Sequence, residues 1–422
     1  MTNNVNMNNS FDAIVIGAGP AGMMAAGTAA QKGMRVLLLE KKERPGRKLM
    51  ITGKGRCNVT NQCTAEEVIA AVPTNGRFLY SAMAGFSPQD TMAFFEGLGV
   101  PLKVERGNRV FPCSDRAVDI VDALQGFVRS SGVTVYTESP AAKLLLEDAS
   151  VRGVVTAEGE EFYAPRVLIA CGGSSYPGTG SNGDGVRLAK QAGHTITPLR
   201  PSLVALNMIE EEDCRTAQGL SLRNCAIQVV DLAKRRVIYE DFGELLFTHF
   251  GLSGPVILSA SAHMRQMSPG RYRILLNLKP ALTPEQLDTR LQRDLRENQN
   301  RDFLNSLGAL LPRKLIPLVV QRSGIPPHQK CCEITRTQRQ KLGETLRELT
   351  FTVRQFRPIE EAIVTAGGVS VKEVNPRTME SKKCTGLYFA GEVLDVDAYT
   401  GGFNLQIAFA TGHLAAESWS NE

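Results

Sequence analysis

The sequence lacks the cysteine patterns that hold a metal ion or a network of disulfides. Its nine cysteines include no CxxC pair, and neither a histidine nor a further cysteine pair lies near Cys57 and Cys63. An odd, scattered set of cysteines is typical of reduced thiols in the cytoplasm. We therefore expect no metal site and predict a cytoplasmic protein.

Long apolar segments are absent as well. No run of about 18 apolar residues occurs, and residues 1–10 (MTNNVNMNNS) have neither the basic start nor the apolar stretch of a signal peptide. We expect no membrane contact and predict that residues 1–10 form a disordered tail. The net charge of +5 is small for 422 residues, so it permits an anionic partner without requiring one.

What the sequence does contain is a βαβ unit near its start. AIVI (13–16) is typical of a short buried strand, GAGPAGMMAAGTAAQKG (17–33) of a helix made of small residues, and RVLLLE (35–40) of a second buried strand. A GxGxxG motif alone is weak evidence, but here it lies between a strand and a helix, with an acid about 20 residues further on. This context predicts a dinucleotide-binding fold.

Each glycine of the motif has a physical role. Gly17 allows the tight turn, Gly19 lets backbone N–H groups approach a pyrophosphate, and Gly22 lets the helix pack closely on the strand. Glu40 can accept hydrogen bonds from both ribose hydroxyls and would repel a 2′-phosphate. The motif therefore predicts FAD or NAD rather than NADP.

The rest of the chain predicts a discontinuous α/β fold. Residues 141–173 indicate a three-stranded meander that runs into a buried strand, whose closing glycines Gly172 and Gly173 let the chain pass close to a cofactor. We predict a Rossmann-like FAD-binding domain, an inserted antiparallel β domain and a helical subdomain. Their expected limits are 11–196 and 352–422 for the FAD-binding domain, 197–280 for the β domain and 281–351 for the helical subdomain.

One polar, glycine-rich stretch, GRKLMITGKGRCNVTN (46–61), matches neither a phosphate loop nor a metal site. It lacks the GxxxxGK[ST] spacing. We interpret it as a connector along the length of FAD. Arg47 and Lys48 would lie at the phosphate or adenylate end, Gly53 and Gly55 would let the backbone pass near the flavin, and RCNVTN would end at the reacting ring.

Residues 281–350 carry 12 Lys and Arg against 8 Asp and Glu. A solvated helical face explains such a charge run. The alternative is a surface for an anionic polymer.

Four long motifs in order, DAIVIGAGPAG, PGRKLMITGKGRCNVTN, LFTHFGLSGP and TAGGVSVKEVNPRTMESKKCTGLYFAGEVLDVDAYTGGFNLQIAFATG, together resemble the YhiN/YtfP flavoproteins, also called the BaiN/RdsA family. The resemblance covers nearly the whole chain after the tail. It implies an FAD domain, a β-barrel-like insert, a helical subdomain and a bacterial cytoplasmic origin. Activities attached to the family are 23S ribosomal RNA dihydrouridine synthase, aminoacetone oxidase and a bile-acid-derivative reductase.

The resemblance also implies which residues hold FAD. The turn after the first strand would bind the pyrophosphate, Glu40 the ribose, Ala142 the adenine, Gly391 and Glu392 the ribityl chain or pyrophosphate, and the 402–406 helix start the flavin N1–C2=O edge. The predicted cofactor-binding residues are Gly17, Ala18, Gly19, Pro20, Ala21, Gly22, Glu40, Lys41, Arg47, Lys48, Gly55, Arg56, Cys57, Asn58, Ala142, Gly172, Gly173, Gly391, Glu392, Gly402, Phe403, Asn404, Leu405 and Gln406.

The family's RNA branch suggests a mechanism. NADH or NADPH would reduce the FAD, a hydride would pass from flavin N5 to C6 of a uracil in 23S ribosomal RNA before full assembly, and an acid would protonate C5. The candidate acids are Cys57, His249 and Tyr399. Each has a structural alternative: Cys57 as a packing residue in a tight turn, His249 as a loop hydrogen-bonding group, and Tyr399 as an aromatic wall over the flavin.

Two other functions remain open at this point. One is a small-molecule flavin oxidase or reductase, acting on an amine or an enoyl-type substrate. The other is a flavin-binding scaffold or redox sensor without fast turnover. No second intact GxGxxG is present, so a nicotinamide donor would dock only transiently.

Overall fold

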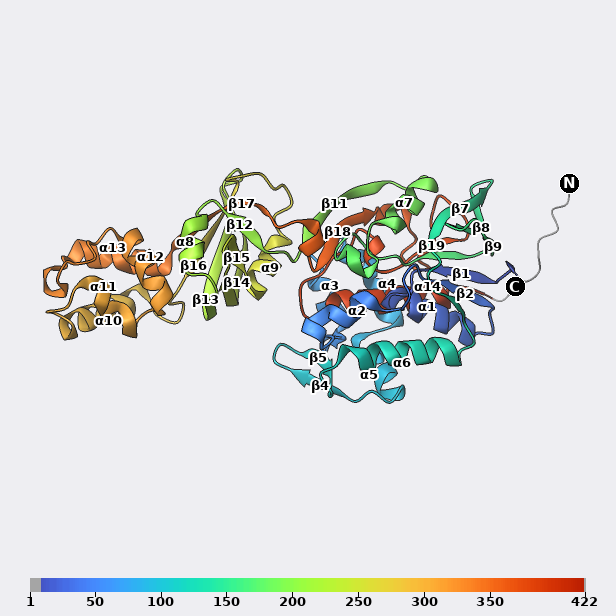
Figure 1. Cartoon of the computed structure of the whole chain (residues 1–422), viewed down its shortest axis with the longest axis horizontal. Helices are drawn as coiled ribbons and strands as arrows, with labels where there is room; N and C mark the ends of the chain where they lie inside the picture. The colour runs from blue at the N-terminus through green and yellow to red at the C-terminus, as the bar shows by residue number, and fades with distance from the viewer. Residues whose placement is uncertain (1–8, 421–422) are drawn as a thin grey trace. The chain divides into compact units, whose positions relative to one another are not determined.

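The computed structural model describes residues 9–420, and the chain forms two compact units. The first unit comprises the described part of Met1–Ser202 and Ile359–Glu422, and the second is Leu203–Pro358. Each has its own hydrophobic core, and Figure 1 labels their elements. The predicted tail lies largely outside the described residues.

A parallel sheet forms the centre of the first unit. Its strand order is β19-β10-β1-β2-β6, and all neighbouring strands are parallel. Every residue of the four strands β1, β2, β10 and β19 is buried, as the apolar runs predict for strands covered on both faces. The bounds are β1 Ala13–Ile16, β2 Val36–Leu39, β6 Thr134–Tyr136, β10 Val167–Ile169 and β19 Leu387–Phe389.

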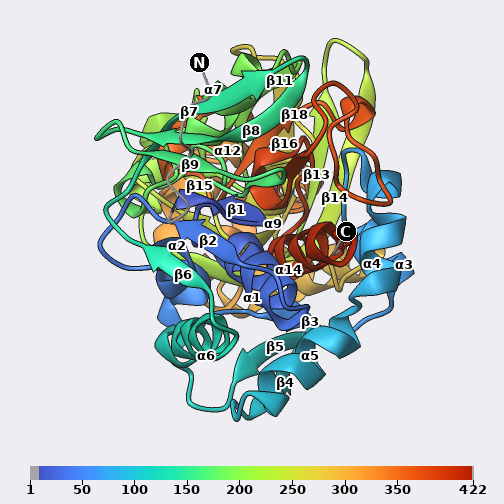
Figure 2. The ribbon, with the colours of Figure 1, turned by 90° about the vertical axis from the view of Figure 1, so that its right-hand side faces the viewer.

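Helices cover one face of this sheet and a meander covers the other (Figure 2). Helix α1 packs along α14, and Gly412 makes this close approach possible, because a Cβ there would lie 2.3 Å from the carbonyl oxygen of Ala21. The meander is antiparallel, as predicted. The bounds are α1 Pro20–Gln31, α6 Ala117–Ser130, α14 Phe403–Glu417, β7 Ala141–Glu147, β8 Ser150–Thr156 and β9 Glu161–Tyr163.

Smaller elements complete the first unit. Ser87 caps α5 in a capping box with Asp90. A hairpin of β4 and β5 turns at Gly107 and pairs with the short strand β3. The bounds are β3 Thr60–Asn61, α3 Ala65–Ala70, α4 Tyr80–Gly85, α5 Pro88–Gly97, β4 Leu102–Glu105, β5 Arg109–Pro112, α7 Asp184–Gln191, β11 Ile196–Ser202 and β18 Val364–Val369.

The second unit is a closed antiparallel barrel with helices. The strand order is β12-β15-β14-β13-β16-β17, and β17 closes the barrel by pairing with both β16 and β12. The strands are β12 Leu206–Met208, β13 Ser221–Asp231, β14 Arg236–Phe247, β15 Gly251–Ser253, β16 Tyr272–Asn277 and β17 Leu349–Phe356. The helices are α8 Glu211–Thr216, α9 Pro255–Ser261, α10 Pro284–Glu297, α11 Phe303–Ser306, α12 Ile316–Ser323 and α13 Arg336–Arg347.

The limits of the units differ from the segment limits expected from the sequence. Strand β11 belongs to the first unit because it pairs with β18, so the second unit begins at Leu203 rather than at 197. Strand β17 belongs to the barrel, although the limit expected at residue 351 between the helical and FAD-binding segments falls within it. Its first five residues alternate between buried and half-buried, which fits a barrel wall. No helix of residues 9–420 is long and apolar enough to cross a bilayer.

Candidate functional site

The turn between β1 and α1 has the geometry that the glycine motif predicts. Gly17 has φ of +102°, and a Cβ on Gly22 would lie 1.9 Å from the carbonyl oxygen of Gly17. A Cβ on Gly19 would meet no atom within 4 Å. Two glycines are therefore required by the protein's own packing, whereas Gly19 borders open space that a ligand can enter.

The carboxylate of Glu40 lies beside this turn. Its Oε2 accepts a hydrogen bond from the backbone N–H of Ala18 at 2.9 Å, and its Oε1 accepts one from the N–H of Lys42 at 2.9 Å. Each carboxylate oxygen has a second acceptor position, so Glu40 can both brace the turn and accept from ribose hydroxyls.

A half-buried ion pair lies where β10 and β19 end. Lys48 Nζ is 2.6 Å from Glu392 Oε2 and donates to Ser175 Oγ at 2.7 Å. Glu392 Oε1 also accepts from the N–H of Thr365 at 2.7 Å. The pair joins residues 344 positions apart in the chain, and nothing in the sequence identified Ser175 or Thr365 as members of the site.

Arg47, the residue before Lys48, does not take part in the ion pair with Glu392. Arg47 opens helix α2 (Arg47–Ile51), is more than a third exposed and pairs with Glu43 at 2.5 Å. Adjacent helical residues point about 100° apart, so α2 presents only Lys48 to the Glu392 cluster. Lys41 is likewise engaged, with Asp184 at 2.7 Å.

Only part of the glycine-rich stretch 46–61 is buried. Gly53, Lys54 and Gly55 are exposed and have left-handed backbone conformations, so this part of the stretch lies at the surface of the first unit. Cys57 is completely buried with φ of +59°, and burial raises the pKa of its thiol to about 12. These features favour the packing role for Cys57 over that of a proton donor.

The residues on either side of Cys57 differ from each other. Arg56 is held by Glu105 and Asp115, and its guanidinium lies 4.2 Å from the ring centroid of Phe111. Asn58 Oδ1 is buried and has no hydrogen-bond partner among the described residues. A buried acceptor without a partner is energetically costly. Of Arg56, Cys57 and Asn58, Asn58 is therefore the residue that a bound ligand would satisfy by donating a hydrogen bond.

The start of α14 is fixed against β3. A Cβ on Gly402 would lie 2.3 Å from the carbonyl oxygen of Thr60, so only glycine fits there. Asn404 donates to the carbonyl of Ala398 at 2.8 Å and accepts from its N–H at 2.9 Å, which holds the loop that carries Tyr399.

Gln406 has a structural role that its sequence motif does not reveal. Its side chain accepts from the hydroxyls of Thr60 and Thr91, each at 2.7 Å, and donates to the carbonyl of Phe86 at 2.8 Å. Its own N–H bonds to the carbonyl of Gly402. The predicted cofactor contact from Gln406 is therefore taken up by the protein itself.

Three further predicted residues, Ala142, Gly172 and Gly173, lie where the backbone passes close to other segments. Ala142 lies at a register shift between β7 and β8, and its carbonyl accepts from Arg187. Gly172 has φ of +73°, and a Cβ on Gly173 would lie 2.4 Å from Thr365 Oγ1. His249 belongs to the second unit, in the exposed turn between β14 and β15, whereas Cys57 and Tyr399 belong to the first.

One side chain that the sequence analysis missed is Arg200 on β11. Its Nη1 is buried without a hydrogen-bond partner among the described residues. Ser202, two residues on and therefore on the same face of the strand, donates to Asp397 at 2.7 Å. Arg200 therefore lies on the face of β11 that contacts Asp397, two residues before Tyr399.

Comparison with known proteins decides the family. The family model for the HI0933-like protein Rossmann domain matches residues 11–418. The chain belongs to the HI0933-like family. It is 33% identical over 409 residues to a 3-dehydro-bile acid delta(4,6)-reductase of Clostridium scindens, covering 96% of this chain and 98% of the relative. It is 32% identical over 409 residues to a ribosomal RNA dihydrouridine synthase of Escherichia coli, covering 96% and 97%.

A solved structure adds evidence on the fold alone. The 3-ketosteroid delta1-dehydrogenase of Sterolibacterium denitrificans superposes with a TM-score of 0.52 at 14% identity, covering 97% of this chain and 99% of that one. The family match and the two relatives, not this structure, show that the HI0933-like chain is an enzyme, an FAD-dependent oxidoreductase. Among residues 9–420 no group of three or more His, Cys, Asp or Glu side chains is arranged to hold a metal ion.

The residues present fit FAD. The open space at Gly19, the acceptor Glu40 beside it and the orphaned oxygen of Asn58 are all features of the first unit that a bound dinucleotide would complete.

Proposed function

We propose that this HI0933-like protein reduces a carbon–carbon double bond conjugated to a carbonyl group, and that its substrate is a uridine of 23S ribosomal RNA. The observation that carries the proposal is the nearly full-length similarity to ribosomal RNA dihydrouridine synthases of Escherichia coli and Haemophilus influenzae, at 32% and 29% identity. The bile-acid relative supports the reaction type, because its name also describes reduction of double bonds near an oxidised carbon. Acting on this RNA implies a cytoplasmic protein.

FAD, when bound, supplies hydride transfer, with NADH or NADPH as the proposed source of electrons. The protein's part is to bind and orient. The turn from Gly17 to Gly22 would hold the pyrophosphate, and Lys48 would offset part of its charge while Glu392 and Ser175 fix the ammonium group. The first N–H groups of α14 would stabilise negative charge on the flavin ring of the bound cofactor.

The same unit offers groups for the substrate. Arg200 can donate its unpaired Nη1–H to the carbonyl oxygen conjugated to the double bond, which stabilises negative charge there after hydride addition. Tyr399 is the proposed proton donor, since Asn404 fixes its loop. The Tyr399→Phe variant should keep its FAD and lose turnover, and Arg200→Lys should raise KM or lower kcat without loss of FAD.

The direct test uses the purified FAD-loaded enzyme, NADH or NADPH, and unmodified 23S ribosomal RNA made by transcription. Mass spectrometry of the digested RNA should show one uridine that has gained two hydrogens. The complementary test compares ribosomal RNA from a deletion strain with the parent. A complete dihydrouridine pattern in the deletion strain, with no product in vitro, would reject the RNA substrate.

A small conjugated ketone is the second candidate, favoured by the identity of 33% to the bile-acid reductase. A steroid carrying a 3-oxo-4,6-diene is the probe, and loss of its ultraviolet absorbance reports reduction. Efficient reduction of this probe together with inactivity on RNA would favour the second candidate.

A further inference from the structure

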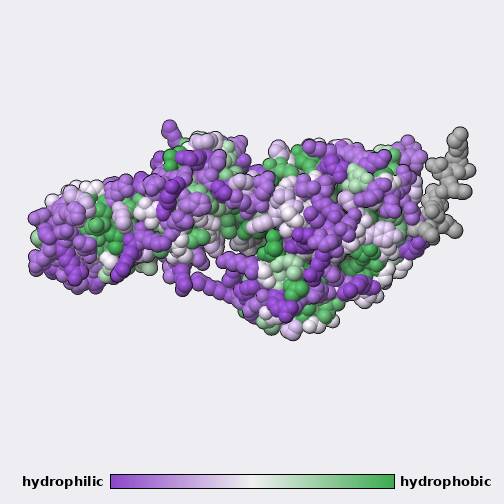
Figure 3. Space-filling model, in the orientation of Figure 1, coloured by the Kyte–Doolittle hydropathy of each residue, from purple (hydrophilic) through white to green (hydrophobic). Residues whose placement is uncertain are grey.

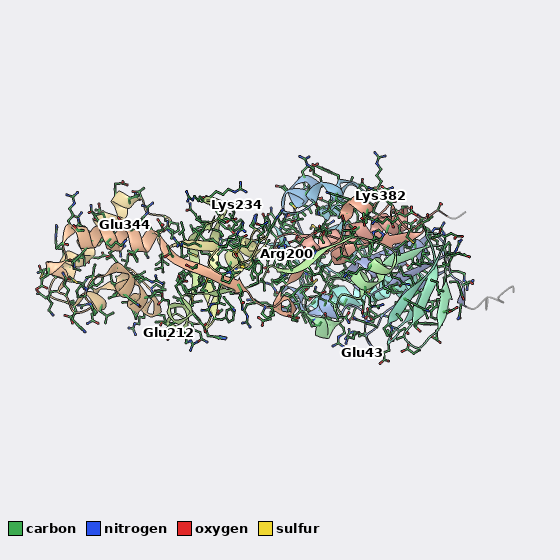
Figure 4. All side chains as sticks on the ribbon, turned by 90° about the horizontal axis from the view of Figure 1, so that it is seen from above. Glu43, Arg200, Glu212, Lys234, Glu344 and Lys382 are labelled. Carbon is green, nitrogen blue, oxygen red and sulfur yellow. The ribbon has the colours of Figure 1, made fainter. Side chains whose placement is uncertain are left out.

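The turn between β13 and β14, together with the first residue of β14, carries three consecutive cations, Lys234, Arg235 and Arg236, which we term the hairpin tip. All three are exposed, and none forms an ion pair with any residue from 9 to 420. Figure 4 labels Lys234, whose side chain extends away from the barrel ribbon. Arg273 on β16, exposed and without an ion pair in the same described range, lies opposite Val230 near this end of the barrel.

The tip is held in a defined shape. Asp231, only 2% exposed, accepts hydrogen bonds from the N–H groups of Ala233 at 3.0 Å and Lys234 at 3.2 Å. Arg271 completes the bracing with its Nη2 at 2.9 Å from Asp231. A buried carboxylate that ties the turn to β16 keeps the three cations together, which lowers the ordering cost of contacting a partner.

The second unit has another basic segment, residues 281–350, in which many cations form ion pairs, unlike those of the hairpin tip. In residues 281–350, which the sequence analysis considered as a surface for an anionic polymer, Arg290 pairs with Asp294 and Arg339 with Asp288, each at 2.7 Å. Lys330 pairs similarly with Asp302. Six of the twelve cations of that segment form ion pairs in the described range, so half of its positive charge is neutralised locally, whereas none of the three tip cations is paired within the same range.

The net charge of the whole second unit also favours an anionic partner. Residues 203–358 contain 23 Lys and Arg against 16 Asp and Glu, whereas the rest of the chain has 25 against 27. The positive excess therefore belongs to the unit that carries the tip, and hydrophilic residues predominate over that unit on the face drawn in Figure 3. Unpaired cations on a braced ribbon are complementary to successive phosphates.

We propose that the hairpin tip binds the phosphate backbone of the RNA substrate. The inference rests on the proposed function and adds a docking element to it. The contact is electrostatic and independent of base sequence, so it positions the RNA while the first unit selects the uridine. Each phosphate neutralised releases counterions, so the tip should contribute to the salt dependence of binding.

The test compares two triple variants of the FAD-loaded full chain. One replaces the tip (Lys234→Gln, Arg235→Gln, Arg236→Gln). The matched control removes three exposed cations on α10 and α13 that form no ion pair in the described range (Arg296→Gln, Arg336→Gln, Arg347→Gln). Filter binding to transcribed 23S ribosomal RNA is measured from 50 to 300 mM KCl, alongside FAD content and the thermal midpoint.

We expect the tip variant to keep its FAD and midpoint, to bind RNA about tenfold more weakly and to lower the slope of log K against log salt by about 2 to 3. The control should stay close to wild type. Equal weakening in both variants, or none in the tip variant, would overturn the tip's role while leaving the RNA function intact. Absence of RNA binding by the wild-type enzyme would overturn the function itself.

Discussion

Gly19 and Gly22 lie three residues apart in one motif, but the structure assigns them opposite kinds of constraint. A Cβ on Gly22 would lie 1.9 Å from the carbonyl oxygen of Gly17, so α1 or the turn would have to move by about 1 Å. Overpacking costs about 1–3 kcal/mol and occasionally more, and a clash with backbone falls at the upper end because the backbone cannot rotate away. Gly22→Ala should therefore destabilise the protein even without cofactor.

Gly19→Ala should act differently. Gly19 has φ of −81° and ψ of −175°, which alanine adopts without strain, and its Cβ would enter open space. The free energy of unfolding of the FAD-free protein should change by at most about 1 kcal/mol, the cost of alanine at a helix N-cap. FAD affinity should fall, because the methyl group occupies the space through which the pyrophosphate must approach the backbone.

The expected loss is about 1–3 kcal/mol of binding energy, the usual cost of one extra methyl in a fitted site, or about 5- to 150-fold in Kd. Urea unfolding of the apoprotein and titration with FAD by flavin fluorescence measure the two effects separately. Gly126→Ala, which also enters open space but lies on α6, is the matched control and should leave FAD binding unchanged. Wild-type FAD affinity in Gly19→Ala would refute the placement of the pyrophosphate.

Three further predictions concern other groups. Lys48→Met leaves Glu392 half-buried without its cation, so it should lower both stability, by about 1–2 kcal/mol, and FAD affinity; adding Glu392→Gln should restore stability in urea unfolding but not FAD binding. Cys57→Ala should retain turnover on RNA and lose stability, because the thiol is completely buried in a tight turn and serves to pack it; an inactive, folded, FAD-loaded variant would contradict this. Burial opposes ionisation of Glu373, but hydrogen bonds from Lys383 and Thr195 lower its pKa to about 2. Its contribution, at most about 3 kcal/mol, is therefore present above pH 4.5 and lost as the pH falls toward 2, and Glu373→Gln should flatten the acid limb of the stability curve; an unchanged limb would exclude Glu373 as its cause.

The local elements follow directly from the sequence because neighbouring residues determine them. The buried strands β1 and β2, the glycine turn between them and the capped helix α5 each depend on residues within about ten positions. The positions that must be glycine for steric reasons, Gly17 and Gly22, were also correctly assigned from their spacing. The family resemblance supplied the barrel and the cofactor, which periodicity alone does not predict.

Tertiary structure decided which polar groups are already satisfied. The sequence treats Gln406 and Asn58 alike as cofactor-binding residues, but Gln406 is saturated by Thr60, Thr91 and Phe86, whereas Asn58 Oδ1 has no partner in the described chain. These partners are more than 300 positions from Gln406 in sequence, so no local pattern records them.

The same holds for charge. From composition, residues 281–350 are the basic region, yet half of their cations are held in ion pairs, and the hairpin tip with fewer cations keeps all of them free of ion pairs in the described range. The sequence thus determined which residue types are available and where the chain turns. Only the fold determined which charges and hydrogen-bonding groups remain to meet a ligand, because neutralisation depends on distances of a few ångströms between residues far apart in the chain.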